Sequence, residues 1–229
     1  MTKQHVTFKE VFNFGWAKTR QHWWYMICTL LIYAVILSAV ERSEGFKLFI
    51  SLLIALSLLS ISLVIAKNEH FNFSTLFDKL RSPRVVLNFL ILTGLYVVAA
   101  TIFFVPLIAS IFVMMNNLAH GVALVNLPMR LISILVIAIV LAIPGIIISV
   151  RFKLFPYVLL ENEHLNFIDI IRSTFNLTRG YFWKIFTLLI LLGLLNILGA
   201  VSVFGLVITI PISVFALAHF YRHLAGHII

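Results

Sequence analysis

The chain has 229 residues, of which 62% are hydrophobic and 11% are charged, and its formal net charge is +9. A soluble domain is typically about 25% charged, so this composition excludes a soluble globule. Because the basic residues lie at the ends of apolar segments, the charge indicates membrane orientation and attraction to anionic lipid headgroups, not binding of nucleic acid.

The polar first 22 residues predict an amphipathic helix. Its apolar side chains recur at helical spacing, and Thr7 followed by Glu10 is a capping-box start. With aromatic side chains on one face and cations elsewhere, we expect this helix to lie in the membrane interface; the alternative is a helix packed on a protein partner. The stretch has no signal-peptide core, so we expect the first apolar segment to be retained. The apolar stripe consists of Phe8, Val11, Phe12 and Trp16.

Six apolar segments predict six transmembrane helices in three hairpins. A span needs roughly 20 apolar residues, and two of the segments are longer than that. We therefore expect kinks at Pro106 and at Pro144-Gly145. The single cysteine, Cys28, lies inside the first segment and permits no disulfide within the chain. The segments are residues 23–40, 48–66, 85–115, 129–160, 183–200 and 204–224.

An internal repeat organises the chain. Residues 164–183 align without a gap on residues 5–24, so that His164 matches His5 and Trp183 matches Trp24. A shorter copy, NEHFNF at residues 68–73, matches NEHLNF at residues 162–167. We interpret the chain as one membrane domain of three units, each an amphipathic helix followed by a hairpin, which can pack around a pseudo-threefold axis. The units are approximately residues 1–67, 68–161 and 162–229.

The basic residues predict the orientation of this domain. Fourteen of them lie on the side of the amphipathic helices, and only Arg42, Lys47 and Arg130 lie on the other side. Basic residues concentrate in cytoplasmic loops. We therefore expect both termini to be cytoplasmic, in a bacterial inner membrane. The fourteen are Lys3, Lys9, Lys18, Arg20, Lys67, Lys79, Arg81, Arg84, Arg151, Lys153, Arg172, Arg179, Lys184 and Arg222.

The sequence offers little for catalysis. All eight acidic residues lie in loops or interfacial helices, and there is no HExxH motif, glycine-rich phosphate loop or GxSxG motif. We therefore expect neither an enzyme nor a cofactor. His5, His70 and His164 open the three repeats and are together a candidate zinc site, although local hydrogen bonding explains each of them equally simply.

Two further sets of residues are candidate sites. Cations near the inner ends of the spans can bind lipid phosphate, although long cationic side chains also reach the interface for their own solvation. Prolines within spans can line a solute path, although they can also be packed kinks. The lipid set is Arg20, Arg151, Lys153, Arg172, Arg179 and Lys184; the path or packing set is Pro106, Pro144, Asn196 and Pro211.

The C-terminal part resembles a known family. The motif STFNLTRG at residues 173–180 is followed by a span that begins near Trp183 and by IPISVFALAHFYRHL at residues 210–224. With Pro144-Gly145 and Pro156-Tyr157, these motifs resemble a poorly characterised family of bacterial inner-membrane proteins, related to the membrane domains of some glycerophosphoryl diester phosphodiesterases. The resemblance covers about the last 90 residues, and the rest only by hydropathy. It implies a membrane location and no phosphodiesterase activity, because no soluble segment is long enough for that catalytic domain.

The sequence thus predicts an all-α, polytopic inner-membrane protein that is not an enzyme. We expect it to engage anionic lipids, or to scaffold a protein partner or form a homo-oligomer, through its cytoplasmic interfacial helices. The alternative is a transporter or channel with a path between the repeats.

Overall fold

The computed structural model describes residues 7–39, 44–67, 69, 79–119 and 129–226, and within these residues all regular secondary structure is helical. Five helices are long and apolar enough to cross a membrane, which makes this an integral, multi-pass membrane protein. The helices are α1 (Phe8–Gln21), α2 (Trp23–Ala39), α3 (Glu44–Ala66), α5 (Pro83–Ala119), α6 (Met129–Phe152), α7 (Phe155–Glu161), α8 (Phe167–Leu177), α9 (Phe182–Ala200) and α10 (Val203–Ala225).

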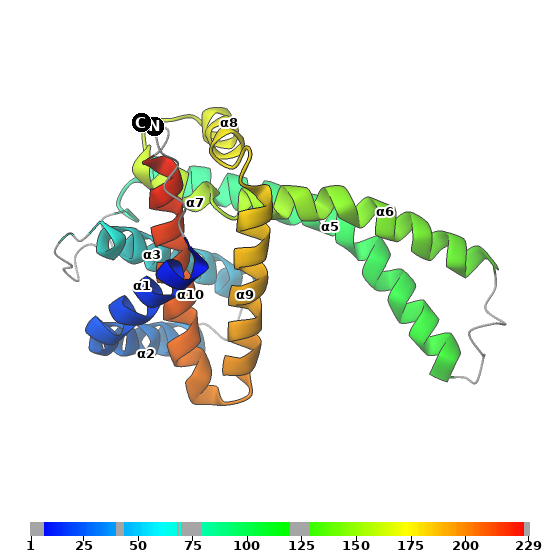
Figure 1. Ribbon diagram of the computed structural model, residues 1–229, viewed down its shortest axis with the longest axis horizontal. Helices are drawn as coiled ribbons and strands as arrows, with labels where there is room; N and C mark the ends of the chain where they lie inside the picture. Colours follow the sequence, from blue (N-terminus) through cyan, green and yellow to red (C-terminus); the bar gives the residue numbers. More distant parts are fainter. Residues whose placement is uncertain (1–6, 40–43, 68, 70–78, 120–128, 227–229) are drawn as a thin grey trace.

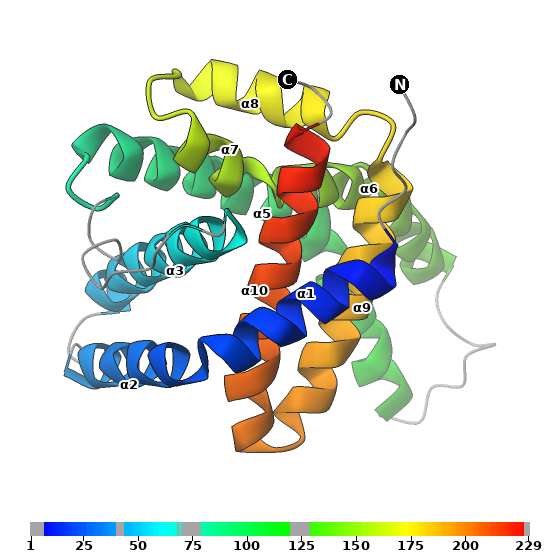
Figure 2. The same cartoon turned by 60° about the vertical axis from the view of Figure 1, so that its left-hand side comes forward.

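The long helices do not share one direction (Figures 1 and 2). Helices α9 and α10 lie side by side, and α3 runs steeply across α10 in both views. Helices α5 and α6 pack on each other and extend away from the other helices as a long arm. The structure therefore does not have the parallel arrangement of hairpins around a threefold axis that the repeat suggested. The first of the six predicted spans corresponds to α2, which is not among the five helices. It has 17 residues, fewer than the roughly 20 that a span requires.

A short buried helix follows α6. Helix α6 ends at Phe152, and α7 begins at Phe155 with a proline in its first turn. Pro156 has no N–H to donate to the carbonyl of Phe152 and disfavours helical geometry in the residue before it, so the helix breaks there. Residues 155–160 are all buried, although α7 is only 7 residues long. The fourth apolar segment, residues 129–160, is therefore not one straight helix, as its length predicted. It divides at residues 153–154, whereas α6 continues through the expected kink at Pro144-Gly145.

The three prolines inside long helices do not end them. Helix α5 continues through Pro106, α6 through Pro144 and α10 through Pro211. The ribbon of α5 bends along its length (Figure 1), in agreement with the kink that Pro106 predicts. Beside Pro144, Gly145 lets α5 approach closely, because a Cβ at this position would lie 2.6 Å from the Cβ of Phe103.

The first helix is packed on the last one. The buried residues of α1 are Val11, Gly15 and Thr19, which form one helical stripe. A Cβ at Gly15 would lie 2.7 Å from the carbonyl oxygen of Ile212 in α10, so the two backbones approach as closely as only glycine permits. Trp16 of the predicted stripe lies outside this contact and is 55% exposed, so its place in the membrane interface stays a prediction. The predicted stripe was chosen by its large apolar side chains, whereas the closest contact between α1 and α10 is at Gly15, which has no side chain.

The contacts of α1 follow α10 in antiparallel order. Phe14 stacks on His219 with ring centroids 4.1 Å apart, Gly15 lies against Ile212, and Arg20 lies near Ile208. The predicted capping box starts this helix: the Glu10 N–H donates to the Thr7 hydroxyl, and the Thr7 N–H donates to the Glu10 carboxylate. These hydrogen bonds with Thr7 lower the pKa of Glu10.

The helix starts in the first and last units coincide under the shift of 159 positions that aligns His5 with His164. Helices α1, α2 and α3 begin at Phe8, Trp23 and Glu44, and α8, α9 and α10 begin at the equivalent positions. Helix α3 also ends at the equivalent of the last residue of α10, whereas the ends of the other two pairs differ by two or three residues. The second unit has no such comparison, because residues 70–78 lie outside the described residues. The threefold repeat itself stays a prediction.

Polar contacts join the three units around the end of α7 and the start of α8. Glu161 accepts from the Tyr221 hydroxyl at 2.7 Å and pairs with Lys67 at 3.2 Å. Glu163 pairs with Lys79, and the side chain of Asn166 accepts from Arg84 at 2.9 Å. Asn166 is the N-cap residue of α8, but its side chain makes no capping hydrogen bond.

The Gly15 contact predicts a difference between two glycine substitutions. We expect Gly15→Ala to lower the unfolding temperature in detergent, because the added methyl must displace α1 from α10 at a typical cost of about 1–3 kcal/mol. Gly94→Ala is the matched control, since a Cβ there would meet nothing within 4 Å and a helical alanine adds roughly 0.5–1 kcal/mol. Equal unfolding temperatures for the two variants would contradict the packing of α1 on α10.

Candidate functional site

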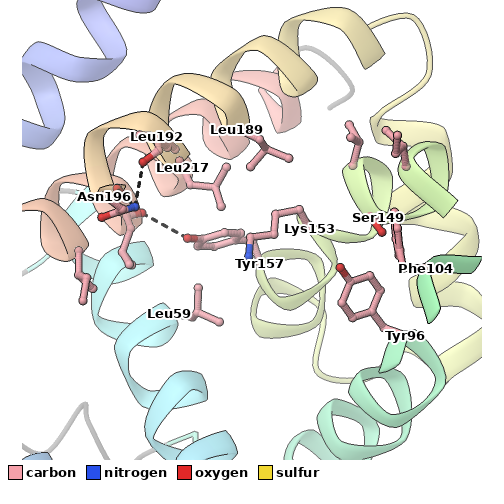
Figure 3. A pocket seen from close by; sticks show the side chains of 16 residues that line it. Leu59, Tyr96, Phe104, Ser149, Lys153, Tyr157, Leu189, Leu192, Asn196 and Leu217 are labelled. Atoms are coloured by element: carbon pink, nitrogen blue, oxygen red, sulfur yellow. Dashed lines mark hydrogen bonds between the residues drawn. The ribbon is translucent and has the colours of Figure 1, made fainter. Parts of the chain in front are cut away.

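The main cavity lies where α3, α5, α6, α7, α9 and α10 meet, and its volume is about 520 Å³. This falls within the roughly 300–1,000 Å³ of sites that hold small molecules. Most of its wall is apolar, and Figure 3 shows the side chains that line it. The aliphatic part of the wall includes Leu59, Ile146, Val150, Leu189, Leu192 and Leu217.

A polar chain crosses from α9 to α10 in one wall of the cavity. The Asn196 amide nitrogen donates to the Leu192 carbonyl and to the Ser213 hydroxyl, each at 2.9 Å (Figure 3). The Ser213 hydroxyl in turn donates to the Thr209 carbonyl at 2.8 Å. The reverse amide orientation would bring the Asn196 oxygen against the Leu192 carbonyl, which cannot donate. The Asn196 oxygen is buried and has no hydrogen-bond partner among the described residues.

Tyr157 of α7 forms another part of the wall. Its side chain is fully buried, and its hydroxyl donates to the Val214 carbonyl at 3.2 Å. Its ring stacks on that of Tyr221 with centroids 5.4 Å apart, and Tyr221 is the residue that donates to Glu161. Tyr157 therefore connects the cavity wall to the polar contacts at the end of α10.

One predicted lipid-binding residue, Lys153, lines the cavity. It occupies the turn between α6 and α7, and Figure 3 shows its side chain beside the ring of Tyr157. The lysine is exposed and has no hydrogen-bond or ion-pair partner within the described parts of the chain. An ammonium group next to a mostly apolar cavity is the arrangement that an amphiphilic anion requires.

The other predicted cations near this turn do not enter the cavity. The Arg151 guanidinium lies over the Phe175 ring at 5.5 Å from its centroid, and its Nε is buried without a hydrogen-bond partner among the described residues. Lys184 lies over the Tyr181 ring at 5.8 Å. Arg172 and Arg179 are exposed, on α8 and just beyond its end.

Arg20 lies apart from the rest of the predicted lipid set. It lines a separate pocket with Trp16, Thr19, Trp23 and Ile208. Ile208 precedes Arg222 by fourteen residues in α10, which is about 21 Å along the helix axis. Arg20 therefore lies far along α10 from Arg222, because α1 runs along α10 instead of lying across its end, and its part in a lipid-binding set with Arg179 stays a prediction.

Of the predicted path or packing residues, Asn196 lines the cavity, whereas Pro106, Pro144 and Pro211 are not among the lining residues. Pro106 and Pro144 are two positions from the lining residues Phe104 and Ile146, and residues two apart on a helix face different sides. The two glycines that flank Asn196 in α9 differ in role. Gly193 lines the cavity, and a Cβ there would meet nothing within 4 Å, whereas one at Gly199 would clash with Thr209 in α10.

The histidine trio is not assembled in the described part of the structure. His164 is exposed in the turn before α8, whereas His5 and His70 lie outside the described residues. Within those residues, no group of three or more histidine, cysteine, aspartate or glutamate side chains is arranged to hold a metal ion.

Sequence reasoning missed four polar residues of the cavity wall: Tyr96, Ser149, Tyr157 and Ser213. Isolated hydroxyl residues inside apolar segments carry no spacing signal, and serine in a span commonly bonds its own helix, as Ser213 does. The Pro156-Tyr157 pair entered the sequence analysis only through a family resemblance. The dipeptide alone gave no reason to place the tyrosine beside a cavity.

Comparisons with known proteins found no matching family model, no matching curated protein and no matching solved structure.

The Asn196–Ser213 hydrogen bond predicts a measurable coupling. In a double-mutant cycle of Asn196→Ala and Ser213→Ala, we expect an interaction free energy near the ~0.6 kcal/mol typical of polar contacts between membrane helices. Unfolding of the purified protein in detergent would measure it. The same cycle with Ser149→Ala is the control; its coupling should be near zero, because Ser149 lines the cavity without bonding to Asn196. Equal couplings in the two cycles would refute a specific bond.

Proposed function

We propose that this protein is a non-enzymatic integral membrane protein that binds the apolar chain of a membrane lipid in its central cavity, with the headgroup near Lys153. The observation that carries the proposal is the cavity itself. It has an aliphatic wall drawn from α3, α6, α9 and α10, and at one side the Lys153 ammonium group, which has no partner among the described residues. Apolar surface favours a hydrocarbon chain, and the ammonium favours an anionic headgroup.

The internal use of other cations also supports this site over a broad cationic rim. Lys67, Lys79 and Arg84 bond to Glu161, Glu163 and Asn166, and Arg222 donates to the carbonyl of Ala66. These side chains are less available to lipid headgroups than the sequence suggested. Lys153 combines a free ammonium with contact to the cavity, so it is the residue to which we assign headgroup attraction.

The finer topology belongs to the same proposal. We infer six spans, with α2 as the sixth, three repeated hairpins, and cytoplasmic termini in a bacterial inner membrane. The fourteen-to-three distribution of basic residues and the coincident helix starts of the first and last units support this. The resemblance to membrane domains of glycerophosphoryl diester phosphodiesterases agrees with this location.

A transporter is the second candidate, and one observation favours it. Helices α5, α6 and α10 all contribute to the cavity wall and each contains a proline, and kinked helices can change shape around a bound solute. Flux of a solute in liposomes, abolished by substitutions near Pro144 or Asn196, would establish it. Lipid binding without flux would leave the lipid-binding function.

Filling the cavity should abolish lipid binding. Gly193→Phe projects a ring into the cavity from a position with no heavy atom within 4 Å of the Cβ, so we expect retained folding and at least about tenfold weaker lipid binding. Gly94→Phe is the matched control, because Gly94 is also in open space but does not line the cavity. Native mass spectrometry with a phosphatidylglycerol series would measure both. Unchanged binding by Gly193→Phe would refute the cavity as the site.

Labelling of single cysteines tests the six-span topology. In a Cys28→Ser background, Gly45→Cys at the start of α3 should react with a membrane-impermeant maleimide in intact cells. Gly226→Cys, at the residue after α10, should react only after the membrane is opened. As equivalent helices of the repeat, α3 and α10 should cross the membrane in the same direction, so the start of one and the end of the other lie on opposite sides. Labelling of both positions from the same side would overturn the proposed path of the chain.

A further inference from the structure

The polar groups in the cavity wall are of two kinds. On the side of α9 and α10, the Asn196 amide donates to Ser213, Ser213 donates to Thr209, and the Tyr157 hydroxyl donates to the Val214 carbonyl. The donors on this side are therefore already used within the protein. The polar group left over on this side is the buried Asn196 oxygen, an acceptor, so an anionic headgroup gains no hydrogen bond here.

On the side of α5 and α6, the donors are available. Tyr96 of α5, Ser149 of α6 and Lys153 of the following turn line the same cavity. Within the described residues, neither the Tyr96 nor the Ser149 hydroxyl nor the Lys153 ammonium has a hydrogen-bond or ion-pair partner. Figure 3 shows the side chains of Tyr96 and Lys153 directed into the cavity from different elements.

One of these three groups, Tyr96, is held in place by a neighbour. The Tyr96 ring stacks on Phe152 with centroids 5.9 Å apart and an angle of 9° between the planes. Phe152 is buried and is the last residue of α6, the helix that carries Ser149 and precedes Lys153. The Tyr96 hydroxyl is thus positioned before a ligand arrives, which lowers the entropic cost of binding.

We propose that Lys153, Tyr96 and Ser149 form a subsite for the anionic headgroup of an amphiphile, a carboxylate or a phosphate monoester, whose chain occupies the rest of the cavity. One ammonium and two neutral hydroxyl donors suit an acceptor-only group of low charge. This inference rests on the proposed lipid-binding function and adds the class of ligand.

The shape of the cavity agrees with an elongated ligand. Along α9 the lining residues extend from Leu189 to Asn196, and along the antiparallel α10 from Leu217 to Ile210. Seven residues of helix correspond to about 10 Å. A chain that enters beside Lys153 therefore passes Leu189 and Leu217 first and reaches the Asn196 level at its far end.

The test compares anionic and neutral amphiphiles of one chain length. Binding of dodecyl phosphate, dodecanoate and dodecanol to the purified full-length protein in a neutral detergent would be measured by calorimetry. We expect the anions to bind at least about tenfold more tightly than the alcohol, because hydrogen bonds to charged groups are the stronger ones. Inorganic phosphate should not compete, since a headgroup without a chain gains nothing from the apolar wall. Phosphate competition at equal strength would identify a free-anion site and overturn the proposal.

The variants separate the subsite from the cavity. Lys153→Gln should remove most of the anion preference while dodecanol affinity stays unchanged, and Tyr96→Phe and Ser149→Ala should each weaken anion binding a few-fold. Arg172→Gln, an equal charge change on the exposed face of α8, is the control and should change neither. If Lys153→Gln loses dodecanol binding as well, the test passes to Tyr96→Phe, which removes only one oxygen atom. Weaker anion binding with unchanged dodecanol binding in that variant supports the subsite.

Two further outcomes have distinct meanings. An anion preference retained in both Lys153→Gln and Tyr96→Phe overturns the subsite but leaves a lipid-binding cavity. Binding of all three amphiphiles that Gly193→Phe does not affect overturns the proposed function itself, because the ligands then bind outside the cavity.

Discussion

The structure depends on the burial of one short helix. Residues 155–160 of α7 are buried on every side, among α3, α5 and α8 and beside Tyr221 of α10. A 7-residue helix is unstable by itself, so these contacts must hold it. Because Pro156 breaks the preceding helix, the turn at Lys153 and Leu154 has a fixed place between α6 and α7. The burial of α7 therefore positions both the cavity wall at Tyr157 and the ammonium at Lys153.

Electrostatics divide the basic residues into two groups with different tasks. Lys67, Lys79 and Arg84 bond to the segment between α7 and α8, and thereby connect helix ends that are far apart in the sequence. Each such pair is partly exposed, so each contributes little stability by itself, on the order of 0–1 kcal/mol. Their effect is to fix which helix ends meet. A count of charges at the helix ends cannot separate these cations from one, such as Lys153, that remains available to a ligand.

The sequence predicted the helices better than their packing. The bounds of α9 and α10 agree with the predicted segments 183–200 and 204–224 to within a residue, because an apolar run is a local signal. The Thr7–Glu10 capping box is also a local signal, and it starts α1 as predicted. The packing of α1 on α10 was missed, because its closest contact is at Gly15, where the absence of a side chain is what matters. In a membrane protein, faces toward lipid and faces toward protein are both apolar, so hydropathy does not say which helices touch. Asn196 was a candidate because an amide in a span is conspicuous, whereas the hydroxyls of Tyr96 and Ser149 are not.

The packing of α1 on α10 has a consequence for the order of assembly in the cell. The ribosome makes α1 first and α10 last, so the surface that receives Val11 and Gly15 does not exist until nearly all of the chain has been synthesised. During that interval α1 must remain outside its final site. An amphipathic helix with cations and aromatic side chains is suited to wait at the membrane surface. The interfacial character read from the sequence then describes a biosynthetic intermediate, and the docked helix describes the finished protein.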